Sequence, residues 1–134
     1  MDTPAPPPRH IPFFEYCHIE RPLRGDGRCV AVVETTPELV NGHGATHGGL
    51  LMTLLDACRA GAASSSLTGA HAGVITIDMQ VQFLNPGHGR LTGEGKVTRG
   101  GGSLIFTEGE IRDAKDVIVA RATGLFRAMR PRAT

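Results

Sequence analysis

The residues from Gly48 onward have the apolar periodicity of one long buried helix of about 17 residues. Leu50, Leu54 and Cys58 fall on a single helical stripe, and the second half of the segment is rich in small side chains. Only strands are predicted in the rest of the chain after this helix. A single long helix can bury its apolar surface in such a chain only if a sheet curls around it.

Alternating or β-branched residues mark the strands. They are expected at residues 28–36, 73–86, 90–99, 103–113 and 117–129, with Gly- and Asp-rich turns between several of them. Within the second strand the alternation is strict, which predicts Thr76 and Asp78 on one face and Ile77 and Met79 on the other. The sequence therefore predicts an α+β domain, a central helix held in a curved antiparallel sheet of about five to six strands.

The chain of 134 residues has room for one domain. Residues 1–10 form a Pro-rich leader that we expect to be disordered, with four prolines among the first eight residues. The domain is expected at residues 11–130 and a short tail at 131–134. Residues 11–17 can form either one helical turn or a short strand.

The composition excludes several classes of partner. The 14 Lys and Arg residues are balanced by 13 Asp and Glu residues, which argues against a nucleic-acid surface. No segment reaches the roughly 18 apolar residues that span a bilayer, and the N-terminus lacks a signal core. The three cysteines have no metal-ligand spacing and are expected to be reduced and buried. We therefore predict a cytoplasmic protein without a membrane partner.

The start of the predicted helix is rich in glycine. Thr46 is the predicted N-cap, but Gly49 stands where a capping box needs Glu or Gln. The amides of Gly48 and Gly49 are therefore expected to lack side-chain partners at the positive end of the helix dipole. Such bare N–H groups can bind an anion or form an oxyanion hole.

Asp56 places a carboxylate in the middle of this helix. One interpretation is an ion pair with Arg59, three residues further on, at a partly exposed edge. The other is a carboxylate directed into a dry cleft, where it acts as a base or nucleophile. The residue pattern alone leaves both interpretations open.

Three other chemistries fit these residues less well. In GHGATHGG, His47 occupies the position of the third glycine of the dinucleotide-binding fingerprint. His43 and His47 are four residues apart, but the glycines between them predict a loop without a common ligand face. Ser64–Ser66 lack a G-x-S-x-G elbow and are expected at a polar helix end. No metal and no organic cofactor is predicted.

Asn41, the HGG at 47–49 and Asp56 together resemble the signature of the hotdog-fold acyl-CoA thioesterases, in particular the PaaI-like branch of the phenylacetate pathway. The resemblance extends from about residue 15 to residue 129, because a long helix, the strand TIDMQVQFLNP and three more strands follow in order. It implies hydrolysis of an acyl-CoA or aryl-acyl-CoA thioester to the free acid and coenzyme A.

The resemblance also implies roles for single residues. The Gly48 N–H would polarise the thioester carbonyl, and Asn41 would add a hydrogen bond to that carbonyl or to the attacking water. Asp56 would be the general base or the nucleophile. Thr76 would help to hold the water, although an ordinary strand threonine is an open alternative. His47 would fix the loop by hydrogen bonding.

Coenzyme A phosphates need cations and open amides. The resemblance assigns them to Gly49, Lys96, Arg99 and Gly100. The sequence departs from the family here, because Gly101–Gly102 stand where relatives often carry another basic residue. A flexible hairpin with solvated charges is the open alternative.

The family further implies a homodimer whose two sheets become continuous, and a homotetramer built from two dimers. In such a dimer Asn41 and Gly48 would face Asp56 of the other chain. Two other functions stay open: a hotdog protein that binds acyl-CoA or an acyl carrier without turnover, and a hydratase that uses His43 or His47.

Overall fold

The computed structural model describes residues 10–100 and 102–131. The predicted leader up to residue 9, Gly101 and tail residues 132–134 lie outside these ranges. The elements are α1 (Pro12–Tyr16), β1 (Glu20–Gly25), β2 (Arg28–Glu34), the 3-10 turn η1 (Pro37–Leu39), α2 (Gly48–Ser65), β3 (Val74–Phe83), β4 (Arg90–Arg99), β5 (Leu104–Asp113) and β6 (Ile118–Ala128).

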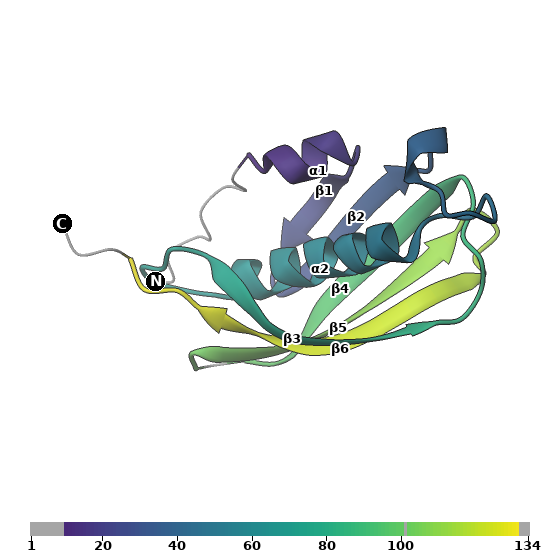
Figure 1. Ribbon diagram of the computed structural model, residues 1–134. Helices are drawn as coiled ribbons and strands as arrows, with labels where there is room; N and C mark the ends of the chain where they lie inside the picture. Colours follow the sequence, from purple (N-terminus) through teal and green to yellow (C-terminus); the bar gives the residue numbers. More distant parts are fainter. Residues whose placement is uncertain (1–9, 101, 132–134) are drawn as a thin grey trace.

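The six strands form one antiparallel sheet in the order β1-β2-β4-β5-β6-β3. The sheet is open and curls around α2, which contacts every strand (Figure 1). The helix has 18 residues and begins at Gly48, and its apolar stripe is buried as the periodicity predicts. The predicted α+β fold, with one long helix in a curved antiparallel sheet, is confirmed.

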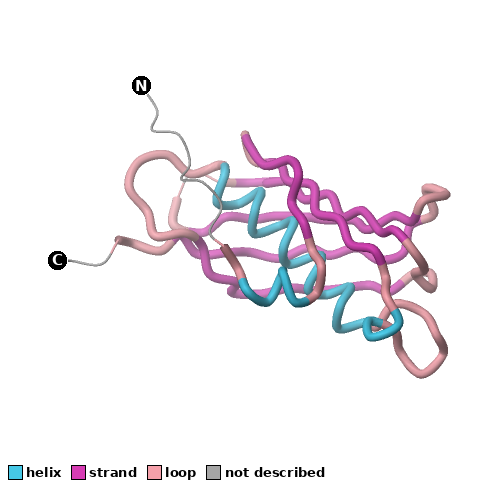
Figure 2. Tube along the Cα trace, turned by 90° about the horizontal axis from the view of Figure 1, so that it is seen from above, coloured by secondary structure: helices cyan, strands magenta, loops and turns pink. Residues whose placement is uncertain are grey.

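Glycines in the sheet let α2 come close to it. A Cβ at Gly95 would lie 2.4 Å from the carbonyl oxygen of Cys58, and one at Gly93 would lie 3.3 Å from Leu54. Side chains at these positions of β4 would push the helix off the sheet. Figure 2 shows α2 lying over the face of the sheet that these strands form.

Two parts of the topology were not predicted. Strand β1 was missed because it is an edge strand without regular alternation of buried and exposed residues; it pairs with β2 through the two-residue turn Asp26–Gly27. Both turn residues have positive φ, the backbone that a tight hairpin of this kind requires. Strands β3 and β4 follow each other in the chain but are not neighbours, because β3 pairs with β6.

Strand β3 contains a bulge that makes the predicted strict alternation wrong. Its register with β6 shifts between Thr76 and Asp78. As a result Thr76, which bonds to a helix residue, and Met79, which packs on the core, both face α2. A bulge adds one residue to a strand, so the faces on its two sides fall out of phase.

Beyond β3 the sheet ends. Among the strands that the structure describes, none pairs with its outer edge. Ile75, Ile77 and Phe83 are 49%, 50% and 54% exposed along it. A ten-residue edge strand with exposed apolar side chains is a template for pairing with another chain.

Candidate active site

The start of α2 is capped by His47, not by Thr46 as predicted. The His47 Nδ1 accepts a hydrogen bond of 2.8 Å from the Gly49 N–H. The Thr46 hydroxyl is buried and donates to the Gly87 carbonyl at 2.9 Å, in the loop that connects β3 to β4. The Thr46 side chain, which the local sequence pattern assigned to the cap, instead forms a hydrogen bond with a residue far along the chain.

Only one of the two amides expected to be bare is free. The Gly49 N–H is occupied by His47, whereas the Gly48 N–H has no acceptor within residues 10–100 and 102–131. A Cβ at Gly48 would lie 3.6 Å from the Phe83 ring at the end of β3. Gly48 thus presents a free N–H at the helix N-terminus, beside the open sheet edge.

Asn41 is held by its own loop. Its Oδ1 accepts hydrogen bonds from the backbone N–H groups of His43 at 2.8 Å and Ala45 at 3.1 Å, and its backbone N–H donates to the Ala45 carbonyl at 2.7 Å. These bonds orient the side-chain amide. Its Nδ2 group has no acceptor in the described part of the chain and keeps its donors for a ligand.

The Asp56 carboxylate is half-buried on α2 and faces β3. Its Oδ1 accepts a hydrogen bond of 2.8 Å from the Thr76 hydroxyl. Thr76 is exposed and stands directly before the bulge. The structure therefore brings Asp56 and Thr76 together, as two of the predicted site residues.

The alternative prediction, an ion pair between Asp56 and Arg59 at a partly exposed edge, is wrong. Arg59 lies on no exposed edge: it is fully buried, and its Nε donates to the Thr107 hydroxyl at 3.2 Å. No carboxylate lies within ion-pair distance of Arg59 among the described residues. Asp56 therefore makes no ion pair with Arg59, although burial lowers the pKa of that guanidinium and the charge of Asp56 is near enough to oppose this shift.

Within one chain the predicted site residues form two separate groups, one around Gly48 and one around Asp56, which we call half-sites. Gly48 and Asp56 are eight residues apart on a straight helix, which separates them by about 12 Å along its axis. A carbonyl carbon that an oxyanion donor and a base act on together must lie about 3 Å from both. The first half-site lies beside Phe83 and the second beside Thr76, at opposite ends of the open edge of β3.

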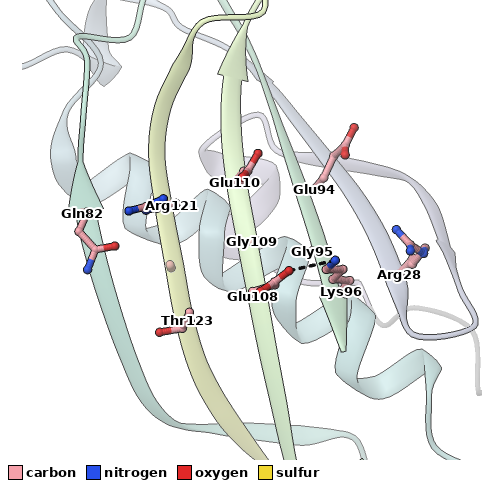
Figure 3. Close-up of a pocket in the computed structure, with 11 residues that line it drawn as sticks. Arg28, Gln82, Glu94, Gly95, Lys96, Glu108, Gly109, Glu110, Arg121 and Thr123 are labelled. Atoms are coloured by element: carbon pink, nitrogen blue, oxygen red, sulfur yellow. Dashed lines mark ion pairs between the residues drawn. The ribbon is translucent and has the colours of Figure 1, made fainter. Parts of the chain in front are cut away.

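The residues predicted to hold coenzyme A are dispersed. Lys96 forms an ion pair of 3.0 Å with Glu108 on the face of the sheet turned away from α2 (Figure 3). Arg99 is exposed at the end of β4, and Gly100 follows it. The Gly49 amide is already occupied. Their roles toward the nucleotide stay predictions.

The outer face of the sheet also carries a hollow of about 540 Å³. Charges of both signs line it, among them Arg28, Glu94, Glu110 and Arg121 (Figure 3). The sheet separates this hollow from the Asp56 carboxylate. We therefore centre the candidate site on Asp56 and the edge of β3.

The three cysteines are free and buried. Burial raises the pKa of the Cys58 thiol to about 12, and the nearby Cys29 acts in the same direction. Burial also raises the pKa values of Cys17 and Cys29. Raised pKa values leave few thiolates, so none of these thiols has the environment of a nucleophile.

Comparison with known families identifies the superfamily of the chain. The sequence pattern of the thioesterase superfamily matches residues 43–120, which include both half-sites at Gly48 and Asp56. The chain belongs to this superfamily. A protein of Saccharolobus solfataricus that is provisionally named an esterase is 32% identical over 105 residues, which are 78% of this chain and 74% of that protein. The superfamily and this relative thus support a thioester hydrolase activity, without specifying the substrate.

Solved structures share the fold. The S. sahachiroi protein AziG superposes with a TM-score of 0.84 at 25% identity, over 92% of this chain and all of that one. The Escherichia coli PaaI protein of the phenylacetic acid degradation operon has a TM-score of 0.83 at 24% identity, over 92% and 88% of the two chains. The hotdog fold of this thioesterase-superfamily member is confirmed, and its place in the PaaI-like branch stays a prediction.

No helix in the described ranges is long and apolar enough to cross a membrane.

Proposed function

We propose that this protein is an acyl-CoA thioesterase of the PaaI-like branch, which hydrolyses an acyl-CoA or aryl-acyl-CoA thioester to the carboxylic acid and coenzyme A. One observation carries the proposal. The half-buried Asp56 carboxylate accepts a hydrogen bond from the Thr76 hydroxyl at 2.8 Å, beside an open sheet edge and without an ion pair in the described structure. An unpaired, oriented carboxylate on a buried helix is the group expected at a reaction centre.

Asp56 would activate the attacking oxygen. As a general base it takes a proton from water while the water oxygen bonds to the thioester carbon. As a nucleophile its own oxygen attacks that carbon, and water hydrolyses the resulting anhydride. The Thr76 hydroxyl holds one carboxylate oxygen in either route, which leaves the other oxygen for the reaction.

The Gly48 N–H would stabilise the oxyanion that forms at the carbonyl oxygen, with the Asn41 Nδ2 group as a second donor. The free Gly48 N–H and the positive end of the α2 dipole support this role. The leaving thiolate needs little help from an acid, because a thiol has a pKa of roughly 8.5. One carboxylate and an oxyanion hole therefore suffice without a cofactor.

A second copy would complete each site. The separation of about 12 Å along the helix between Gly48 and Asp56 is too long for one thioester carbonyl. Antiparallel pairing of two β3 edges about a two-fold axis brings the Phe83 end of one strand to the Thr76 end of the other. Gly48 of one chain then meets Asp56 of its partner, at two equivalent sites per dimer.

Further parts of the proposal follow from the resemblance. Gly49, Lys96, Arg99 and Gly100 would contact the coenzyme A nucleotide, two dimers would form a tetramer, and the protein would be cytoplasmic. Lys96 needs to leave Glu108 to take this role. The buried, free thiols are compatible with a reducing compartment.

The test is thiol release from a panel of aryl and aliphatic acyl-CoA thioesters. The wild-type protein is expected to release free coenzyme A from at least one of them. Asp56→Asn should lower kcat by a factor of about 100 or more, because the amide cannot accept the proton, while acyl-CoA binding persists. Binding without release by the wild type would favour a non-catalytic acyl-CoA binding protein instead.

A further inference from the structure

Arg59 is an unusual residue for the core of this domain. It is fully buried between α2 and the sheet, and its guanidinium lies 5.1 Å from the centre of the Phe126 ring. The Nε group donates to Thr107 on β5, and the Nη2 group donates to the Asp78 carbonyl on β3 at 3.5 Å. One side chain thus connects the helix with three strands.

Two glycines make the space for this side chain. A Cβ at Gly109 of β5 would lie 3.0 Å from the Arg59 Cγ. A Cβ at Gly124 of β6 would lie 2.6 Å from the Arg59 Nη2 and 2.1 Å from the Asp78 carbonyl oxygen. Side chains at these positions would exclude both the guanidinium and the carbonyl that it binds.

Stability alone does not account for a charge at this place. The Nη1 group is buried without a hydrogen-bond partner, and no carboxylate pairs with Arg59 in the described ranges. Burial lowers the pKa of Arg59, and the negative charge of the Asp56 carboxylate is the main opposing influence. Replacement of a buried charge by an apolar side chain of similar volume is often neutral or stabilising.

The Asp78 carbonyl is part of the β3 bulge. The register between β3 and β6 shifts between Thr76 and Asp78, so this carbonyl follows the extra residue. The bulge turns Thr76 toward α2, where its hydroxyl reaches Asp56. Arg59 therefore contacts the irregular point of the strand that aims Thr76.

We propose that Arg59 is a positioning residue, which holds the β3 bulge from inside through the Asp78 carbonyl and so keeps Thr76 directed at Asp56. Its effect on hydrolysis rests on the proposed thioesterase function. Its effect on the bulge does not, and the two can be measured separately.

Arg59→Met and Arg21→Met form a matched pair for the test. Arg21 contacts the same helix from β1, with its Nη1 3.5 Å from the Ala57 carbonyl and its guanidinium 5.1 Å from the Phe14 ring. Within the described structure it makes no hydrogen bond, ion pair or ring contact with β3. We expect Arg59→Met to keep or raise the melting temperature, to lower kcat about tenfold and to change KM by less than about twofold. Arg21→Met should leave kcat unchanged.

A double-mutant cycle with Thr76→Val tests the connection. If Arg59 acts through Thr76, the double variant should lose little more activity than Thr76→Val alone. Fully multiplicative losses, or a kcat of Arg59→Met within about twofold of wild type, would overturn the inference. If Arg59→Met does not fold, Arg59→Lys replaces it in the cycle, since lysine keeps the charge but lacks the planar fork.

Amide hydrogen exchange provides the readout that needs no activity. Exchange at residues 76–80 should accelerate in Arg59→Met and not in Arg21→Met. Unchanged exchange in Arg59→Met would overturn the positioning role whether or not the chain hydrolyses thioesters. The expected exchange together with an inactive wild type would contradict only the proposed function.

Discussion

The Thr76 hydroxyl donates a 2.8 Å hydrogen bond to the Asp56 carboxylate, and this bond joins the edge strand β3 to the middle of helix α2. Asp56 alone is a charged residue on a buried helix. Held by Thr76, it is a carboxylate with one oxygen bonded and the other available at an open edge.

Thr76→Val should lower kcat about 10- to 100-fold, because a hydrogen bond to a charged group contributes about 1.5–3 kcal/mol. Valine keeps the shape of threonine, so the melting temperature should change little. Thr76→Ser keeps the hydroxyl and serves as the control, with kcat close to wild type. The measurement is steady-state kinetics on an acyl-CoA that the wild type hydrolyses. Full activity of Thr76→Val would contradict the role of the Thr76 hydroxyl in holding Asp56.

Gly48→Pro removes the proposed oxyanion donor with little damage to the helix. Proline is tolerated at the first helical position, and His47 has φ −61° and ψ 136°, a backbone that suits a residue before proline. We expect kcat to fall about 100- to 1,000-fold with a nearly unchanged melting temperature.

Gly48→Ala is the matched control for Gly48→Pro. It keeps the N–H, and its Cβ would lie at an ordinary 3.6 Å from the Phe83 ring. Equal activity of the alanine and proline variants would argue against the Gly48 amide as the oxyanion donor.

Mixed dimers test whether the two half-sites meet across chains. Asp56→Asn and Gly48→Pro subunits are refolded together in equal amounts. Random pairing gives about half mixed dimers, each with one intact site of two, so about a quarter of wild-type activity should return. If both groups acted within one chain, no mixed dimer would contain an intact site, and activity would stay at the level of the single variants.

Gly95→Ala should destabilise the domain strongly. The new Cβ would lie 2.4 Å from the Cys58 carbonyl oxygen and 2.8 Å from the Arg59 backbone nitrogen, and neither backbone atom can move without shifting α2. We expect the free energy of unfolding to fall by about 2 kcal/mol or more in urea titrations. Gly25→Ala, with no atom within 4 Å of its Cβ, should stay within about 0.5 kcal/mol of wild type.

Stability should decrease at alkaline pH because of Cys58. Its thiol has a pKa of about 12 in the folded protein and roughly 8.5 in an unfolded chain. Between these values the folded state keeps a proton that the unfolded state has lost, so raising the pH favours unfolding. The contribution is fully present below about pH 8.5 and declines by up to about 1.4 kcal/mol per pH unit above it.

Cys58→Ala tests this dependence in urea titrations between pH 8 and 10. The variant should lose less stability over this range than the wild type, although the raised pKa of Cys29 leaves a slope of the same sign. Identical slopes in the two proteins would contradict the contribution of Cys58.

Local patterns in the sequence determined most elements of this fold. The start of α2 at Gly48 and the strands β2 to β6 follow from periodicity, because the period of buried side chains depends only on backbone geometry. Periodicity did not group the site residues: only the resemblance to the hotdog thioesterases implied that Asn41, Gly48, Asp56 and Thr76 act together. Periodicity does not encode which strands pair, so the edge position of β3 was not predictable in this way.

Tertiary structure decided the contacts of single side chains. Thr46 bonds to Gly87 instead of capping α2, and Arg59 turns inward because Gly109 and Gly124, far along the chain, leave it room. The bulge in β3 reverses the face of every side chain beyond it. The sequence by itself determined the helix that carries Gly48 and Asp56, and with it their separation of about 12 Å along the axis, because the rise per residue is fixed by backbone geometry. The tertiary structure decided what each of them contacts, because the curled sheet places the edge strand β3 along the helix, with Thr76 beside Asp56 and Phe83 beside Gly48.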